Sequence, residues 1–272
     1  MDFRPLPERP FDVDIGAPEV RFYADNGYLA VGRVTTDEEL EWLREVYDAL
    51  IAMKPTGLLD GVFDLSRPYG TTDTPKLGQL LLPERLVPQI RRTAMWRNAH
   101  RIASRLLQVP QSGVESWGHL IFKGADSPAE TPWHQDEAYW GRNLDDKGVT
   151  CWIPLQDVDE RNGCMQFIDA GHLDGVLPHH MVEGVQSDLI TCDVDERRRV
   201  VCPIRRGDVT FHHSKTPHMT NANTSTTWRK AVTNHMQKVG AGGEGDHYPW
   251  KVLVNQRTGE RVVPPSKPLG RE

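Results

Sequence analysis

The chain has 272 residues, of which 38% are apolar and 26% charged, and its 32 Lys and Arg against 38 Asp and Glu give a formal net charge of −6 at pH 7. This composition is typical of an ordinary globular protein and excludes a disordered or fibrous chain. The mild acidity argues against nucleic acid as a partner, and the longest apolar stretches are far too short to cross a membrane.

The beginning of the chain and its cysteines indicate the compartment. Residues 1–14 carry Pro and acidic side chains where a secretory signal has an apolar segment. The four cysteines are widely spaced and include no CxxC pair, so they suggest neither a disulfide framework nor a zinc finger. We therefore expect a cytoplasmic protein in which residues 1–272 form a single domain.

The N-terminal part of the chain is predicted to contain one short strand and one amphipathic helix. A Pro-rich arm of about fifteen residues comes first, and residues 27–31 then have the pattern of a strand. Thr36 and Glu39 have the spacing of a capping box. Apolar residues recur every three to four positions from there to Leu50, which is the period of a helix with one buried face.

A second helix is predicted from about Glu84 to Leu107, with Pro88 near its start and one regular apolar face. The segment between the two predicted helices, residues 54–82, has a composition that is poor in helix formers and contains Pro, Gly and Thr. We expect this segment to be irregular and to lie near a functional site.

The second half of the chain is predicted to consist of short strands. Six segments have extended character: 117–123, 150–155, 165–169, 200–204, 208–212 and 229–239. Asn162-Gly163 predicts a hairpin turn and Arg206-Gly207-Asp208 a second sharp turn. Residues 240–245 are expected to form a Gly-rich loop, and 262–272 a loosely wrapped Pro-rich tail. The order of elements favours a mainly β fold with flanking helices, an antiparallel barrel or sandwich.

His134 and Asp136 are the first candidate metal ligands. Residues two apart in an extended segment point to the same face, so the pair can offer an imidazole and a carboxylate to one ion. A third ligand must come from elsewhere, and the downstream candidates are His212, His213 and His218. Of the adjacent pair, we expect one imidazole to face the core and the other to face solvent.

Among these candidates His218 is favoured by the residues downstream of it. Asn223, Ser225 and Arg229 complete the pattern H-x4-N-x-S-x3-R, and an Arg at that spacing can reach back across a turn from the next strand. Two imidazoles and one carboxylate make up the facial triad of non-haem Fe(II) oxygenases, which leaves three coordination positions open.

Several further motifs occur in order with these residues: Tyr139-Trp140, Trp152-Ile153-Pro154-Leu155, Asn162-Gly163-Cys164-Met165 and Gly207-Asp208. Together with the two ligand motifs, this set resembles the phytanoyl-CoA dioxygenase (PhyH-like) family of Fe(II)/2-oxoglutarate-dependent oxygenases. The resemblance covers a core of about residues 22–239. It implies a double-stranded β-helix, the jelly-roll or cupin-like barrel, with supporting helices.

By position, the resemblance implies that His134, Asp136 and His218 bind Fe(II), and that Arg229 binds the distal carboxylate of the cosubstrate 2-oxoglutarate as a bidentate fork. It further implies a reaction with O2 that hydroxylates a small-molecule substrate and releases succinate and CO2. Related halogenases lack the carboxylate ligand, so Asp136 favours oxygenation over halogenation.

Other positions carry weaker implied roles. Thr220 falls where the family often has a Ser that contacts the same carboxylate, and Trp152 falls at an aromatic position that lines the cosubstrate pocket. Thr131 and Trp140 flank the first ligand pair and are candidates for contact with cosubstrate or substrate. The sequence departs from the family at residues 170–172, where Ala-Gly-His replaces Gly-Ser-His; we expect this to affect loop packing only.

The remaining histidines leave alternatives open. His119 and Lys123 lie on one face of a predicted strand, where they either point into the pocket or form ordinary strand hydrogen bonds. His179 and His180 either contact substrate or have a structural role. His235 has no partner signal in the sequence.

The sequence also bears on the substrate, the oligomeric state and the competing functions. A small free metabolite, such as a natural-product intermediate, is favoured over an acyl-CoA, and the run Arg197–Arg199 is either a solvated face or a phosphate contact. A monomer and a homodimer are both compatible with the sequence. The competing functions are a cupin-type metal enzyme that does not use 2-oxoglutarate, which would not need Arg229, and a non-catalytic binding protein on the same fold.

Overall fold

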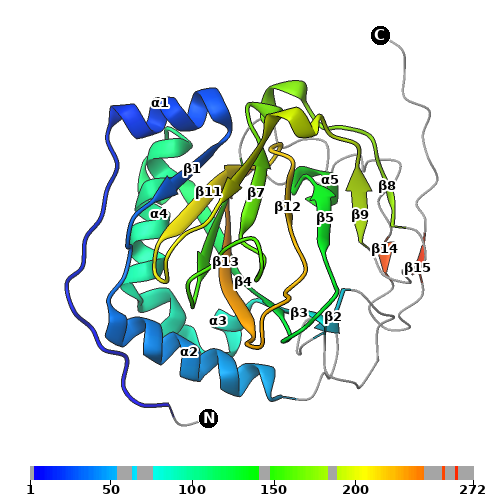
Figure 1. Cartoon of the computed structure of the whole chain (residues 1–272). Helices are drawn as coiled ribbons and strands as arrows, with labels where there is room; N and C mark the ends of the chain where they lie inside the picture. Colours follow the sequence, from blue (N-terminus) through cyan, green and yellow to red (C-terminus); the bar gives the residue numbers. More distant parts are fainter. Residues whose placement is uncertain are drawn as a thin grey trace.

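Two antiparallel sheets form the body of the protein in the computed structural model (Figure 1). The structure describes residues 3–53, 63–65, 76–140, 148–182, 189–241, 253–254 and 261–262. The larger sheet has seven strands in the order β1-β11-β6-β13-β4-β3-β2, and the smaller has four in the order β10-β7-β12-β5. From β4 to β13 the strands of these two sheets alternate along the chain, except that β7 and β10 follow one another in the smaller sheet, as in a jelly roll, which confirms the expected double-stranded β-helix.

The strands of the larger sheet are β1 (Tyr28–Val31), β2 (Phe63–Asp64), β3 (Leu77–Leu81), β4 (Val114–Lys123), β6 (Gly148–Pro154), β11 (Val209–His213) and β13 (Arg229–Lys238). Those of the smaller sheet are β5 (Thr131–His134), β7 (Met165–Ile168), β10 (Arg199–Cys202) and β12 (His218–Thr220). Two small pairs are β8 (His179–Met181) with β9 (Ile190–Cys192), and β14 (Leu253–Val254) with β15 (Arg261–Val262). All six strands predicted in the second half of the chain are therefore present, with ends shifted by up to three residues, and the strand predicted at residues 27–31 is β1.

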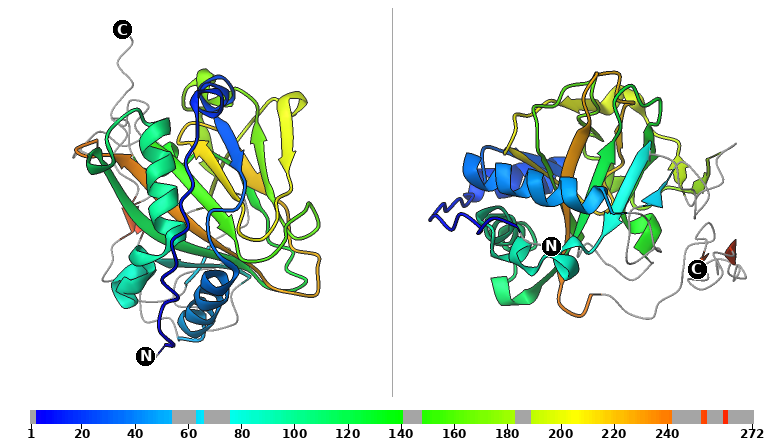
Figure 2. Two further views of the ribbon diagram at one scale, coloured as in Figure 1. Left: turned by 90° about the vertical axis from the view of Figure 1, so that its left-hand side faces the viewer. Right: turned by 90° about the horizontal axis from the view of Figure 1, so that it is seen from below.

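The helices are α1 (Ala17–Asn26), α2 (Asp37–Ile51), α3 (Pro83–Leu86), α4 (Ala94–Leu106) and α5 (Glu137–Trp140), with 3-10 turns η1 (Pro88–Arg92), η2 (Gln111–Gly113), η3 (Gly171–Asp174) and η4 (Glu196–Arg198). Helix α4 packs on β4, β6 and β13 of the larger sheet, and α1 lies against β1 (Figure 2). None of the described helices is long and apolar enough to span a membrane.

The predicted helix of residues 84–107 is wrong in its first half. It is divided into α3, η1 and α4, because Pro88 lacks an N–H and keeps Val87 out of helical geometry, at φ −132° and ψ 83°. Helix α4 then starts afresh at Thr93, whose hydroxyl accepts a hydrogen bond from the Trp96 N–H at 3.1 Å.

Helix α2 begins as the sequence predicts, but its capping box is not closed. The Thr36 hydroxyl accepts a hydrogen bond from the Glu39 N–H at 3.2 Å. The Glu39 carboxylate turns away from Thr36 and accepts hydrogen bonds from the N–H groups of Ala94 at 2.7 Å and Met95 at 2.9 Å. A buried carboxylate of α2 therefore caps the N-terminus of α4, which links the two long helices.

Several elements were not expected from the sequence, among them α1, β3, β5 and β12. Helix α1 lies within a stretch for which no helix was predicted, although Pro18 at its start and Gly27 at its end are ordinary helix boundary signals. Strand β3 corrects the expectation that residues 54–82 are irregular throughout; most of that segment lies outside the described residues. Strand β12 is too short for a two-residue period to be recognised, and β5 contains Pro132, which weakens the pattern of a strand.

The Asn162-Gly163 turn exists, but it does not close a hairpin. Its flanking strands β6 and β7 belong to different sheets, so the turn carries the chain from one sheet to the other. Gly163 has φ +83°, and a Cβ there would lie 2.8 Å from the Asn221 carbonyl oxygen. Gly207 also has a positive φ, +84°, in the second predicted turn. Residues 242–245 and 263–272 of the predicted loop and tail lie outside the described residues.

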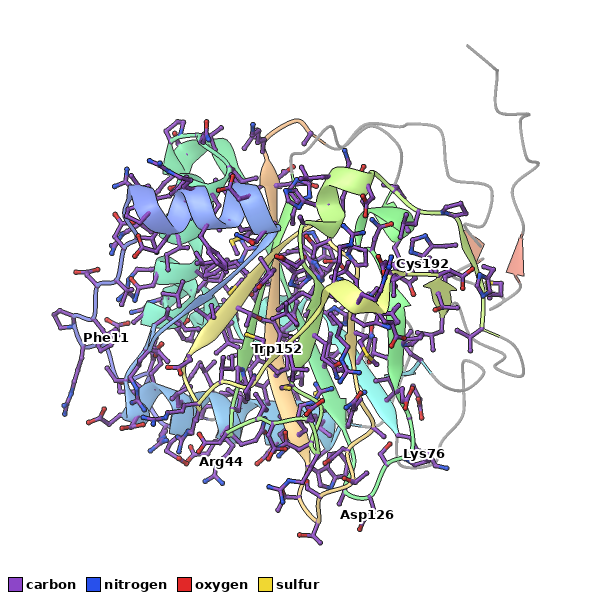
Figure 3. All side chains as sticks on the ribbon, turned by 45° about the horizontal axis from the view of Figure 1, so that its top comes forward. Phe11, Arg44, Lys76, Asp126, Trp152 and Cys192 are labelled. Atoms are coloured by element: carbon purple, nitrogen blue, oxygen red, sulfur yellow. The ribbon has the colours of Figure 1, made fainter. Side chains whose placement is uncertain are left out.

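Apolar packing is concentrated on one side of the larger sheet. The main cluster of buried apolar side chains joins α2 and α4 to the outer face of that sheet, whereas a smaller cluster around Trp152 and Phe167 lies between the two sheets. Figure 3 shows Trp152 near the middle of the molecule. The N-terminal arm runs along α4, where the Asn98 amide donates to the Phe11 carbonyl at 2.8 Å. The space between the sheets is therefore left for polar side chains and a pocket.

Candidate metal centre and adjoining pocket

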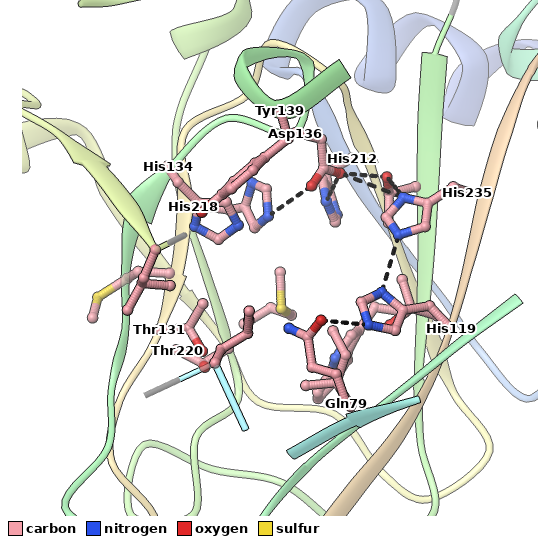
Figure 4. A pocket seen from close by; sticks show the side chains of 18 of the residues that line it. Gln79, His119, Thr131, His134, Asp136, Tyr139, His212, His218, Thr220 and His235 are labelled. Atoms are coloured by element: carbon pink, nitrogen blue, oxygen red, sulfur yellow. Dashed lines mark hydrogen bonds and ion pairs between the residues drawn. The ribbon is translucent and has the colours of Figure 1, made fainter. Parts of the chain in front are cut away.

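The three predicted metal ligands lie together at one end of the smaller sheet. His134 ends β5, Asp136 follows it before α5, and His218 begins β12, directly opposite His134 in the strand pairing. One ligand atom from each residue lies within 4.8 Å of the others, and all three residues are at most 9% exposed (Figure 4). Two imidazoles and one carboxylate in this arrangement can bind a divalent ion on one face.

Backbone carbonyls orient both imidazoles of this group. Nδ1 of His134 lies 2.7 Å from the Pro132 oxygen, and Nδ1 of His218 lies 2.9 Å from the Thr216 oxygen. Each Nδ1–H therefore donates to a carbonyl, and each Nε2 keeps its lone pair for a metal. Burial lowers the pKa of both histidines, so the imidazoles are neutral and ready to bind.

The carboxylate is kept ionised by its neighbours. Burial by itself raises the pKa of Asp136, but His218 and His212 outweigh it and hold that pKa well below its ordinary value. His212 lies on β11 with its Nε2 3.2 Å from Asp136 Oδ2. It is 1% exposed and His213 is 8% exposed, so the expectation that one of them faces solvent is wrong; β11 lies inside the sheet, between β1 and β6.

Arg229 is a buried cation without a hydrogen-bond partner. It begins β13, is 1% exposed, and none of its three guanidinium nitrogens is hydrogen-bonded to the described residues. The guanidinium carbon lies 5.7 Å from the centre of the Trp152 ring. Burial lowers the pKa of Arg229 to about 10, so the group is still charged at neutral pH. A buried charge of this kind requires an anion, and a guanidinium fork matches a carboxylate.

A second orphaned group lies at the same end of the pocket. The Thr220 hydroxyl is buried and has no hydrogen-bond partner within the described ranges. Lys123 lies beside Arg229 in the strand pairing, but its Nζ donates to the carbonyls of Thr220 at 3.0 Å and Asn221 at 2.6 Å. Arg229 and Thr220 thus both have unused donors at this end of the pocket, and they fit the distal carboxylate of 2-oxoglutarate.

The cavity between the sheets measures about 320 Å³ and joins this end to the metal ligands. Thr131 and Trp152 line it, in agreement with their positions in the resemblance; the side chain of Trp140 lies outside the described residues. The wall opposite the ligands is formed by Gln79, Trp117, His119 and His235. Of these, the sequence indicates His119 as a pocket candidate, on a predicted strand face that it shares with Trp117.

The position of His235 in the pocket follows from the alternation of side chains along its strand. Side chains of one strand alternate between its two faces, and Arg229, Thr233 and His235 all line the cavity from β13. Extending the two-residue period from Arg229 therefore places His235 in the pocket. The same period along β4 connects Trp117, His119 and Ile121, all of which line the cavity.

The other sequence candidates have structural roles. Nε2 of His179 accepts a hydrogen bond from the Gln135 N–H at 3.1 Å and so restrains the backbone between His134 and Asp136. His180 is exposed. The run Arg197–Arg199 is engaged in ion pairs with neighbouring carboxylates: Asp195, Asp174 and Glu160. This arrangement favours the solvated-face interpretation of the arginines.

Comparison with known proteins agrees with this geometry. The family model described as phytanoyl-CoA dioxygenase (PhyH) matches residues 23–231. The peroxisomal phytanoyl-CoA dioxygenase of Bos taurus is 23% identical over 238 residues, which are 79% of this chain and 66% of the bovine protein. The chain thus spans slightly less than two thirds of the length of that relative.

Two solved structures have a similar fold. EvdO2 from Micromonospora carbonacea var. aurantiaca, in complex with 2-oxoglutarate, is 28% identical with a TM-score of 0.74, covering 90% of this chain and 99% of its own. SnoK, a non-haem α-ketoglutarate-dependent carbocyclase from nogalamycin biosynthesis, is 23% identical with a TM-score of 0.61, covering 82% of this chain and 84% of its own.

Proposed function

Because the chain belongs to the phytanoyl-CoA dioxygenase family of Fe(II)/2-oxoglutarate-dependent oxygenases, we propose that it hydroxylates a C–H bond of a small-molecule metabolite, with release of succinate and CO2. The observation that carries this proposal is the buried guanidinium of Arg229, which has no hydrogen-bond partner among the described residues and lies in the same cavity as the three candidate metal ligands. We further propose that residues 1–272 act as one oxygenase domain.

Each residue of the site has a defined part in this proposal. His134, Asp136 and His218 hold Fe(II), and since the imidazoles are already neutral and the carboxylate ionised, the site binds the metal without losing protons. Arg229 and Thr220 bind and orient the distal carboxylate of 2-oxoglutarate. When bound, Fe(II), 2-oxoglutarate and O2 supply the oxidant. The buried walls keep water away from it and place one C–H bond beside it.

Both alternatives fit the site less well. A cupin-type enzyme that does not use 2-oxoglutarate gives no reason to bury an unpaired guanidinium, which costs free energy without an anion. A non-catalytic binding protein gives no reason to retain a complete ligand set together with that cation. The likeness to a carbocyclase shows that the fold is compatible with other outcomes, so the hydroxylation is tested on products.

The cavity indicates what kind of substrate reaches the metal. Gln79, Trp117, His119 and His235 are neutral hydrogen-bonding and aromatic groups. Burial lowers the pKa of His119 to about 3 and of His235 to about 4, so neither is charged at neutral pH. Among the described lining residues Arg229 is the sole Lys or Arg, and the cosubstrate uses it. The reacting part of the substrate is therefore small, neutral and able to form hydrogen bonds.

An anaerobic titration tests the core of this proposal. Fe(II) and then 2-oxoglutarate are added to the metal-free protein, and the visible metal-to-ligand charge-transfer band is followed. We expect a band that saturates near one equivalent. Iron binding without a band would favour the cupin-type alternative, and no iron binding would favour a non-catalytic protein. A screen of neutral metabolites against carboxylates and acyl-CoA esters, read by succinate release, then tests the substrate class.

A further inference from the structure

The two oxygens of the Asp136 carboxylate have different surroundings. Oδ2 accepts a hydrogen bond from the Thr150 hydroxyl at 2.5 Å and lies 3.2 Å from Nε2 of His212. Oδ1 lies 3.7 Å from Nε2 of His218 and faces the other ligands. One oxygen is thus held by the larger sheet, while the other faces the metal position (Figure 4).

The groups that hold Oδ2 form a row across three adjacent strands. Thr150 on β6 is paired directly with His212 on β11 and with His235 on β13. All three side chains line the same cavity and are at most 7% exposed. Asp136 reaches this row from the side of the smaller sheet. The strand pairing therefore fixes the positions of these side chains relative to one another before any metal binds.

A chain of hydrogen-bonded side chains extends from Thr150 across the neighbouring strands of the larger sheet. Nδ1 of His235 lies 3.1 Å from the Thr150 hydroxyl, and Nε2 of His235 lies 3.4 Å from Nδ1 of His119. Nε2 of His119 in turn lies 2.8 Å from the Gln79 side-chain oxygen. The chain runs from β6 through β13 and β4 to β3, which are neighbours in the sheet. Connected buried hydrogen bonds of this kind restrict the side chains that they join.

A carboxylate can bind a metal through one oxygen or through both, and binding through both occupies an additional coordination position. We propose that Thr150 and His212 are positioning residues that hold Oδ2 of Asp136, so that this ligand offers the metal Oδ1 alone. The inference rests on the proposed function, because three of six positions must stay open for 2-oxoglutarate and O2. Neither Thr150 nor His212 touches the metal in this arrangement; each acts through Asp136.

Four variants test the proposal in the full chain: Thr150→Val, Thr150→Ser, His212→Phe and the double variant Thr150→Val/His212→Phe. Each is titrated anaerobically with Fe(II) and then with 2-oxoglutarate, and the charge-transfer band is recorded. We expect Thr150→Val and His212→Phe each to weaken Fe(II) binding about tenfold or more, as loss of an outer contact to a ligand does elsewhere. Thr150→Ser keeps the hydroxyl and restores the affinity.

The double variant separates positioning from packing. With both donors removed, Oδ2 is free to bind the metal as well, so 2-oxoglutarate loses a position and its band weakens even at saturating Fe(II). The matched control is Thr210→Val on β11, whose hydroxyl is also buried but has no hydrogen-bond partner in the described structure and does not line the cavity. It should bind Fe(II) and 2-oxoglutarate as the unchanged protein does.

The outcomes distinguish this inference from the proposed function. Normal binding by Thr150→Val and His212→Phe, with a normal band in the double variant, would overturn the inference and leave the oxygenase proposal standing. A failure of Thr150→Ser to restore binding would show that packing, not the hydroxyl, matters. If the unchanged protein binds no Fe(II), both ideas fall. Should Thr150→Val not fold, which the melting temperature reveals, His212→Phe alone decides the question.

Discussion

Replacing Arg229 with Met should make the cosubstrate-free protein more stable while removing its response to 2-oxoglutarate. Met has a similar length and no charge. Burial lowers the pKa of Arg229 from its ordinary value to about 10, and a shift of that size corresponds to about 3 kcal/mol of unfavourable free energy in the folded state. The contact with the Trp152 ring offsets about 1 kcal/mol of this.

The net gain for Arg229→Met is therefore about 2 kcal/mol, which raises the melting temperature by about 4–8 °C in a chain of this size. In the unchanged protein, Mn(II) with 2-oxoglutarate at a hundred times its Kd should add about 2.7 kcal/mol, or about 5–10 °C. Arg229→Met should show the first effect and lack the second. Differential scanning calorimetry with Mn(II), with and without 2-oxoglutarate, measures both.

A matched control is Arg101→Met, because Arg101 is 25% exposed and paired with Asp12 at 2.9 Å on the outer surface. It should keep the full response to 2-oxoglutarate. If Arg229→Met melts below the unchanged protein without cosubstrate, the guanidinium has a stabilising partner and the argument from its orphaned donors is refuted. If it still gains stability from 2-oxoglutarate, the cosubstrate does not bind there.

Three further outcomes are expected. His218→Ala should abolish Fe(II) binding, measured by anaerobic titration, while the circular dichroism spectrum of the metal-free protein stays the same. Burial lowers the pKa of His119 to about 3 in the folded state, well below its value of about 6.5 in the unfolded chain. Its contribution to stability is therefore present above about pH 6.5 and is lost as the pH falls towards 3. His119→Gln should accordingly flatten the fall in unfolding free energy between pH 6 and 4. Gly163→Ala should cost about 1–3 kcal/mol in urea unfolding because of its φ of +83° and the close Asn221 carbonyl, whereas Gly32→Ala, with open space around its Cα, should cost little.

Each of these results has a clear opposite. If His218→Ala keeps its affinity for Fe(II), His218 is not a metal ligand and the proposed triad is wrong. An unchanged pH slope in His119→Gln would mean that this imidazole is solvated in the folded chain. Equal losses in Gly163→Ala and Gly32→Ala would show that the turn between the sheets tolerates a side chain.

Local patterns were sufficient for the elements with strong, uninterrupted periodicity. Helix α2 and the six strands predicted in the second half of the chain follow from local patterns, since burial of one face imposes a regular apolar spacing on the chain. Residues 84–107 have a continuous apolar face, which predicts one helix. Pro88 interrupts that helix, because proline keeps the preceding residue out of helical geometry. The departure of Glu39 from its capping box depends on α4, 55 residues later, which no local pattern contains.

The sequence by itself determined the family, and it predicted the candidate ligands because His134, Asp136, His218 and Arg229 are recognisable by type and spacing along the chain. Only the tertiary structure decided what surrounds them. The row on β6, β11 and β13 that holds the carboxylate forms because strands distant in the sequence are paired in register, and that register is set by packing of the whole sheet. The unpaired state of the Arg229 guanidinium is likewise a property of the closed interior, where the fold excludes every other partner among the described residues and leaves the charge for a ligand.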